Sequence, residues 1–389
     1  MKISQKVLLQ ILFVCFLVAI PLRIVKEHYS ADDKFLGLIY FGDEFEEDSL
    51  PEVKEIDPAR SSPHGYDGQF YAQIALRPTL SDPALIEAVD NIGYRAQRIG
   101  LPWLAYLLGA GQPNWVLQIY ALLNFVFYFL LLGVLWKQIG FHNYRDCLLA
   151  FSLLLTTGTL VCLSRALTDF PATSIGVMAM LVTSRWWLAA MLLSGAAMIK
   201  DSSILSFAAI PLQRDSIKGD LKRLIPAGVI VCLPITLWAL SLSLRLPAKN
   251  MSDSGIFGFP LLGIGTKILK EFQSLPAFDF DLPLEPQIAI WAELICPMTL
   301  LVQAAYMICK PKLNSQFWRF GIGFAILLFF LGESVWEEHN AYTRVCLPLT
   351  FAFNLLIHKF EKGKLHFVWF ISGNLGMFSL LFLILGQVF

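Results

Sequence analysis

Apolar stretches recur along the whole chain, and most charged residues lie between them. The pattern predicts eleven apolar helices, at about 7–25, 114–136, 147–164, 170–184, 186–199, 202–212, 224–244, 288–309, 317–334, 341–358 and 366–386. Two of them, 186–199 and 202–212, are shorter than the ~20 residues that a full span needs, so we expect broken or tilted helices that meet at Lys200 and Asp201. We therefore predict an all-α, polytopic integral membrane protein with about eleven transmembrane or partial helices.

The composition supports this class of protein. Hydrophobic residues make up 56% of the 389 residues and charged residues only 15%, and the mean hydropathy is +0.60. Soluble domains carry about 25% charged residues, which excludes a soluble globular enzyme. Thirty Lys and Arg balance thirty Asp and Glu, so no basic surface indicates a nucleic-acid partner. The seven cysteines form no CxxC pair and indicate neither a disulfide framework nor a metal site.

The charges also predict a topology. The first apolar stretch lacks a small-x-small cleavage site, so we expect a retained signal anchor with the N-terminus inside. Strict alternation then gives the short inner segments 15 Lys and Arg against 4 Asp and Glu, while the outer side holds 15 against 26. The positive-inside rule expects this bias. We predict one membrane domain, 1–389, with two long outer loops at 26–113 and 245–287.

The first outer loop contains a carboxylate, Asp67, between Gly65 and Gly68. Such glycines suit a turn at the start of a helix, and the sequence from 66 to 90 is compatible with helix. Apolar residues at positions 70, 71, 74 and 75 predict a helical stripe that lies in the membrane interface. Asp67 could cap this helix, which its local sequence favours, or act as a base on an incoming hydroxyl.

Several cations and carboxylates are predicted on the same outer side. Arg95 and Arg98 are three residues apart, so they either extend to lipid phosphates or clamp the phosphate of a bound lipid. Ionisable residues at the ends of membrane helices are costly and indicate function; here they are Arg165, Asp169, Lys200, Asp201, His339 and Arg344. Lys200 and Asp201 could also simply pair within the helix bundle. Together these residues predict a polar site at the outer leaflet.

The sequence Gly65-Tyr66-Asp67-Gly68-Gln69-Phe70-Tyr71 resembles the first-loop signature of bacterial GT-C-type membrane glycosyltransferases. The similar branch comprises cell-surface glycopolymer formation proteins, related to polyprenyl-phosphate-sugar glycosyltransferases. Family-like positions follow in the same order at 94–104, 168–169, 200–203 and 344–349. The resemblance implies a GT-C-like fold in the bacterial inner membrane. It also implies an enzyme that transfers a sugar, with inversion, from a polyprenyl-phosphate carrier to a glycan or lipid acceptor on the outer face.

The resemblance assigns the role of general base to Asp67, which we now favour over capping. As a mechanistic hypothesis, we expect some of Arg95, Arg98, Lys200 and Arg344 to bind the donor phosphate. The residues expected to line the pocket are Tyr66, Gln69, Tyr71, Arg165, Asp169, Asp201 and His339. No cofactor is required, and a divalent metal at the DxD pattern of Asp279 and Asp281 is not supported. The alternative function is a non-catalytic transporter, flippase or assembly subunit for lipid-linked saccharides.

Overall fold

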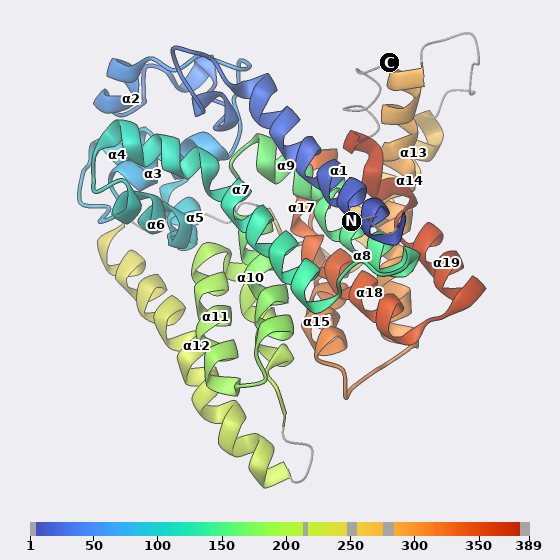
Figure 1. Ribbon diagram of the computed structural model, residues 1–389. Helices are drawn as coiled ribbons and strands as arrows, with labels where there is room; N and C mark the ends of the chain where they lie inside the picture. The colour runs from blue at the N-terminus through green and yellow to red at the C-terminus, as the bar shows by residue number, and fades with distance from the viewer. Residues whose placement is uncertain (1–4, 213–216, 247–254, 275–283, 382–389) are drawn as a thin grey trace. The chain divides into compact units, whose positions relative to one another are not determined.

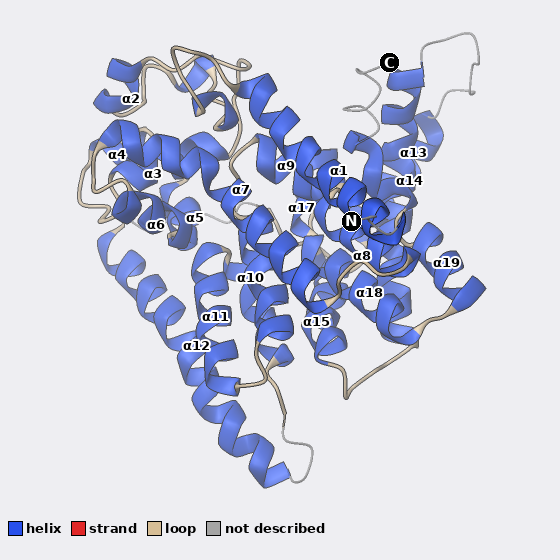
Figure 2. Cartoon of the chain, viewed as in Figure 1, coloured by secondary structure: helices blue, strands red, loops and turns tan. Residues whose placement is uncertain are grey.

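The computed structural model describes residues 5–212, 217–246, 255–274 and 284–381 (Figure 1). All regular secondary structure in these ranges is helical, and the β-type pairing among them is limited to isolated bridges (Figure 2). The prediction of an all-α protein is therefore confirmed for the part of the chain that is described.

Four helices contain stretches long and apolar enough to cross a membrane: α1 (Gln5–His28), α7 (Pro113–Gln138), α12 (Ile217–Arg245) and α14 (Leu284–Cys309). A fifth span exists if α8 (Tyr144–Leu154) and α9 (Thr157–Ser164), which are bent by 45°, cross together. Four further apolar helices have only 14 or 15 residues: α10 (Asp169–Val182), α11 (Trp186–Ile199), α15 (Gln316–Phe330) and α18 (Leu347–Phe360). The structure thus supports a membrane protein with four or five candidate spans in the described residues, and the expectation of about eleven transmembrane or partial helices is not confirmed.

The short predicted segments break where the sequence indicated. Helix α11 ends at Ile199, Lys200 is extended, and a 3₁₀ helix, η4 (Asp201–Ala209), follows directly. The predicted segment 341–358 is also divided, into α17 (His339–Val345) and α18, which has Pro348 in its first turn. The last predicted segment, 366–386, is divided in its described part into α19 (Gly363–Ser372) and the 3₁₀ helix η6 (Leu375–Phe378), and its positions after 381 lie outside the described residues.

The chain divides into two compact units. Unit 1 comprises Met1–Leu17, Leu135–Val161 and Asp253–Phe389, and unit 2 comprises Val18–Val134 and Cys162–Ser252. In unit 1, α18 packs on α8 and α15, and α13 (Leu262–Ser274) packs on α14 and on α16 (Glu333–Trp336). The single membrane domain at 1–389 stays a prediction, and each unit is described by itself.

The helices α10, α11 and α12 of unit 2 pack in sequence order through small side chains (Figure 1). Their fully buried cluster is rich in alanine: Ala179, Ala189, Ala190, Leu193, Ile210, Ala227 and Val231. Small residues let helix backbones approach closely, as is typical of helices packed within membranes. This packing fixes the end of α11, from which Lys200 and Asp201 extend.

The first outer loop folds into short helices in unit 2: η1 (Leu36–Leu38), η2 (Asp43–Phe45), α2 (Pro51–Ile56), α3 (Gly68–Leu76), α4 (Ala84–Glu87), α5 (Ile92–Arg95), η3 (Ala96–Arg98) and α6 (Gly100–Leu108). The helix-compatible sequence at 66–90 is confirmed as α3 and α4. The expectation that this helix lies in the interface is wrong, because all nine residues of α3 are buried by protein.

The polar face of α3 explains this burial. The Gln69 side chain accepts a hydrogen bond from the Gly42 amide (3.0 Å) and donates one to the His64 carbonyl (3.0 Å). Gln73, one turn later, makes an equivalent pair of bonds to two other segments of the loop. Buried amides need such partners, so the loop wraps the helix. Gln69, predicted in the pocket, holds the loop together.

Gly68 is expected to tolerate no side chain. A Cβ at this position would lie 2.3 Å from the Arg165 carbonyl oxygen and 2.8 Å from that of Ile39, both of which are backbone atoms. Gly68→Ala should therefore lower the free energy of unfolding by about 1–3 kcal/mol, measured by denaturant titration in detergent. Gly195→Ala in α11 is the matched control, since nothing lies within 4 Å of its Cβ. Equal effects of the two substitutions would contradict this expectation.

Candidate functional site

The turn between α9 and α10 is held by α7 within unit 2. The Tyr120 hydroxyl donates to the Ala166 carbonyl (2.9 Å), and the Asn124 amide donates to the Leu167 carbonyl (2.9 Å). Ala166 has a positive φ of 47°, so the chain reverses sharply there. These contacts place Arg165 on one side of the turn and Asp169 at the start of α10.

Asp67 stands at the N-cap position of α3, but its side chain makes no capping hydrogen bond. Its Oδ1 lies 2.9 Å from Nη2 of Arg95 instead, and its side chain is 18% exposed. The capping role that the local sequence favoured is therefore not what this carboxylate does. A partly exposed carboxylate at a helix start remains available to an incoming hydroxyl.

Arg95 is held between two carboxylates. Its Nε and Nη2 bond to the two oxygens of Asp90 at 3.0 and 2.7 Å, a bidentate pair, while Nη2 also contacts Asp67. Burial by itself would lower the pKa of the Arg95 guanidinium, but the charge of Asp67, then Tyr71 and Asp90, raise that pKa above its ordinary value. Arg95 is thus a permanent cation beside Asp67.

Arg98 is enclosed by protein, with only 4% of its side chain exposed. Its Nε donates to Oδ1 of Asp201 (3.0 Å), and Nη1 donates to the Tyr71 hydroxyl (2.6 Å). The ring of the same Tyr71 lies 5.6 Å from the Arg95 guanidinium, so it links the two arginines. Extension of these side chains to lipid phosphates, the simpler of the two alternatives, does not occur in this conformation.

Lys200 and Asp201 take different partners. Lys200 Nζ lies 2.9 Å from Oδ1 of Asp169, and these two side chains are 8% and 3% exposed. Asp201 pairs with Arg98, whose charge, together with that of Lys200, lowers the pKa of the Asp201 carboxyl although burial alone would raise it. The pair of Asp201 and Arg98 links the start of η4 to the first loop, and the pair of Lys200 and Asp169 links η4 to the start of α10.

Arg165 differs from Arg95, Arg98 and Lys200, the other cations of the candidate site. Its guanidinium lies over the rings of Tyr66 (4.3 Å) and Tyr40 (5.0 Å). Among the described residues it has no carboxylate partner, whereas Arg95, Arg98 and Lys200 each have one. Its backbone touches Gly68, the residue after Asp67. Of these four cations, three contact carboxylates and Arg165 lies against aromatic rings.

Unit 2 thus brings together ten of the twelve predicted site residues: Tyr66, Asp67, Gln69, Tyr71, Arg95, Arg98, Arg165, Asp169, Lys200 and Asp201. His339 and Arg344 belong to unit 1 and are described there. His339 lies between the Tyr342 hydroxyl and Ser379 Oγ, each 2.8 Å from a ring nitrogen, and its burial lowers its pKa. Arg344 is buried in α17.

Two partners of the arginines escaped the sequence analysis. Asp90 binds Arg95 with both oxygens, and the Tyr94 hydroxyl accepts a hydrogen bond from Arg98 while its ring lies 4.2 Å from that guanidinium. The signal was local, because Asn91 caps α5 and so places Asp90 immediately before a helix that ends at Arg95. Asp90 lies five positions before Arg95 and Tyr94 lies four positions before Arg98, so both partners are close to their arginine in the sequence.

No group of three or more His, Cys, Asp or Glu side chains within the described ranges is arranged to hold a metal ion. Asp279 and Asp281, the DxD pattern, lie outside the described residues. Comparison with known protein families, with characterised proteins and with solved structures finds no match to this chain.

Proposed function

We propose that this chain is an inverting, GT-C-like glycosyltransferase of the bacterial inner membrane. It transfers a sugar from a polyprenyl-phosphate carrier to a glycan or lipid acceptor on the outer face, in cell-envelope glycan biosynthesis. The observation that carries the proposal is the state of Asp67. This carboxylate does not cap its helix, is partly exposed and faces the guanidinium of Arg95.

The proposed chemistry is a single displacement. The acceptor hydroxyl oxygen attacks the anomeric carbon, and its proton passes to Asp67. The bond between the anomeric carbon and the phosphate oxygen breaks, and the electron pair leaves with the lipid phosphate. Cations near that oxygen stabilise its developing charge. The phosphate-binding role expected for Arg344 from the sequence stays a prediction.

The ion pairs bear on which cation is the main ligand of the donor phosphate. Arg95, Arg98 and Lys200 already contact carboxylates, so a phosphate must compete with Asp90, Asp201 or Asp169 for them. Within the described part of the chain, the Arg165 guanidinium lies over the rings of Tyr40 and Tyr66 and pairs with no carboxylate. We therefore assign Arg165, which the sequence analysis placed in the pocket, as the principal phosphate ligand. In this assignment the paired cations hold Asp67 and α3 in place.

Arg165→Gln is expected to raise KM for the lipid-linked donor roughly 10- to 100-fold, since a hydrogen bond to a charged group contributes about 1.5–3 kcal/mol. The measurement is a donor titration with the purified chain in lipid nanodiscs. Arg245→Gln is the control, because Arg245 lies at the end of α12, where its guanidinium donates a hydrogen bond to the carbonyl of Thr79. An unchanged KM in the Arg165 variant would remove this residue from the donor site.

The membrane leaflet on which the lipid-linked donor accumulates distinguishes a transporter from a transferase. In a strain that lacks the chain, loss of a transferase leaves lipid-linked sugar on the outer leaflet, whereas loss of a flippase leaves it on the inner leaflet. Spheroplasts treated with periodate, which does not cross the membrane, followed by mass spectrometry of the lipid, distinguish the two. Donor that is protected from periodate would overturn the proposed transfer.

A further inference from the structure

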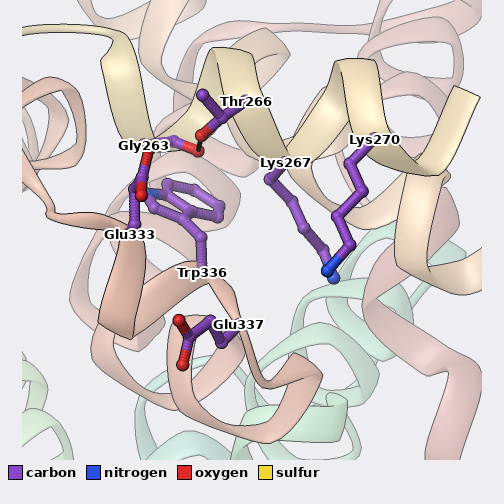
Figure 3. Close-up of a pocket in the computed structure, with 7 residues that line it drawn as sticks. All are labelled: Gly263, Thr266, Lys267, Lys270, Glu333, Trp336 and Glu337. Atoms are coloured by element: carbon purple, nitrogen blue, oxygen red, sulfur yellow. Dashed lines mark hydrogen bonds between the residues drawn. The ribbon is translucent and has the colours of Figure 1, made fainter.

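Unit 1 contains a small pocket between α13 and the segment that begins with α16 (Figure 3). Its volume is about 160 Å³, enough for roughly five water molecules or one sugar ring. The residues that line it are Gly263, Thr266, Lys267, Lys270, Glu333, Trp336 and Glu337. All of them lie in unit 1, so the pocket is defined without reference to unit 2.

Trp336 gives the pocket an aromatic wall and an unused donor. The residue is 1% exposed, and among the described residues its indole N–H has no hydrogen-bond partner. A buried donor without an acceptor costs about 1–3 kcal/mol, which a bound acceptor would recover. A Cβ on Gly263 would lie 2.7 Å from the indole Cδ1, so a glycine is what lets α13 approach the ring.

The charges around the pocket disfavour an anion. Lys267 is neutralised by Glu293 (2.6 Å) and Glu271 (3.0 Å), and the pocket wall adds Glu333 and Glu337 against the single remaining cation, Lys270. The two lysines of the pocket are therefore outnumbered by four glutamates in or next to its wall. The pocket offers the carboxylate acceptors of the glutamates, the donors of the lysines and a wall formed in part by the Trp336 indole, a combination that a neutral polyhydroxyl ring matches.

We propose that this pocket binds a neutral saccharide unit, with Trp336 against the ring and Glu333 and Glu337 accepting hydrogen bonds from its hydroxyls. The exposed face of α13 beside it carries Leu262, Leu269 and Phe272. The sugar can therefore come from solution or from a glycolipid whose chains lie along that face. The proposal does not depend on Asp67 or on transfer.

The test uses the full chain in nanodiscs and saturation-transfer NMR with the methyl glycosides of glucose, mannose and N-acetylglucosamine. At least one glycoside should bind saturably. Glu337→Gln, a conservative change at an exposed side chain, should weaken that binding about tenfold. Trp336→Phe, which keeps a ring but removes the N–H, should also weaken it. Glu338→Gln is the matched control, because Glu338 is not among the residues that line the pocket. This variant should bind the glycoside as tightly as the wild type does.

Nanodiscs that contain glucosyl diacylglycerol distinguish the two sources. Displacement of the methyl glycoside by this lipid supports a glycolipid head group, and lack of displacement supports a free sugar. Binding of inorganic phosphate in place of the glycosides, absence of saturable glycoside binding, or full binding by Glu337→Gln would overturn the proposal. Asp67→Asn should bind glycosides normally, so failure of the transfer proposal remains distinguishable.

Discussion

Replacing Asp67 with asparagine is expected to lower kcat for sugar transfer by about 10²- to 10⁴-fold, the usual contribution of a general base. Asparagine keeps the size of the side chain but cannot take up the proton of the acceptor hydroxyl. Stability should change little, because Asp67 makes no capping hydrogen bond and Arg95 keeps its bidentate partner Asp90. The measurements are single-turnover transfer in nanodiscs and thermal unfolding of the same samples.

Asp57→Asn is the control for this experiment. Asp57 lies in the same loop, 78% of its side chain is exposed, and its left-handed backbone conformation (φ 48°) is one that asparagine adopts readily. It should transfer sugar at the wild-type rate. Full activity in Asp67→Asn, or a loss of stability without a loss of kcat, would remove Asp67 as the base and favour the transporter or assembly subunit.

Lys200→Met is expected to cost about 3–5 kcal/mol in the free energy of unfolding, because it removes the cation that pairs with the buried Asp169 carboxylate. Asp169 is 3% exposed at the start of α10, and its Oδ1 lies 2.9 Å from Lys200 Nζ. The double variant Lys200→Met with Asp169→Asn should recover most of the loss, since it removes both charges. Denaturant titration of the three variants in detergent measures the effect.

The exposed pair of Arg23 and Glu27 in α1 is the control for the buried pair. These residues are 2.7 Å apart, but their side chains are 28% and 38% exposed. Arg23→Met should therefore change stability by less than about 1 kcal/mol. Similar losses in Arg23→Met and Lys200→Met would show that burial does not govern the cost, and failure of the double variant to recover would assign Lys200 a role other than neutralising Asp169.

The positions of most long helices could be read from the sequence. The apolar run predicted at 114–136 is α7 (Pro113–Gln138), and the break predicted at Lys200 and Asp201 separates α11 from η4. Such features are local, because an uninterrupted apolar run favours helix in a membrane and adjacent charges interrupt it. The count of spans was less predictable, since apolar helices of 14 or 15 residues are ambiguous by length alone.

The site shows what sequence periodicity misses. The apolar stripe of α3 predicted an interfacial helix, yet the two glutamines on this helix bind loop segments up to 27 residues away and bury it. Arg98 pairs with Asp201, 103 residues along the chain. Asp67 occupies a capping position but faces Arg95. The partner of each side chain depends on which segments tertiary packing brings within hydrogen-bond reach.

The sequence by itself determined the all-helical class, the membrane character and the identity of the charged residues that could act together, because hydrophobicity and charge are properties of short segments. Only the tertiary structure decided which of those charges neutralise one another and which, like Arg165, lie against aromatic rings. That difference arises because hydrophobic burial is non-directional, whereas ion pairs and hydrogen bonds require particular atoms within about 3 Å of each other.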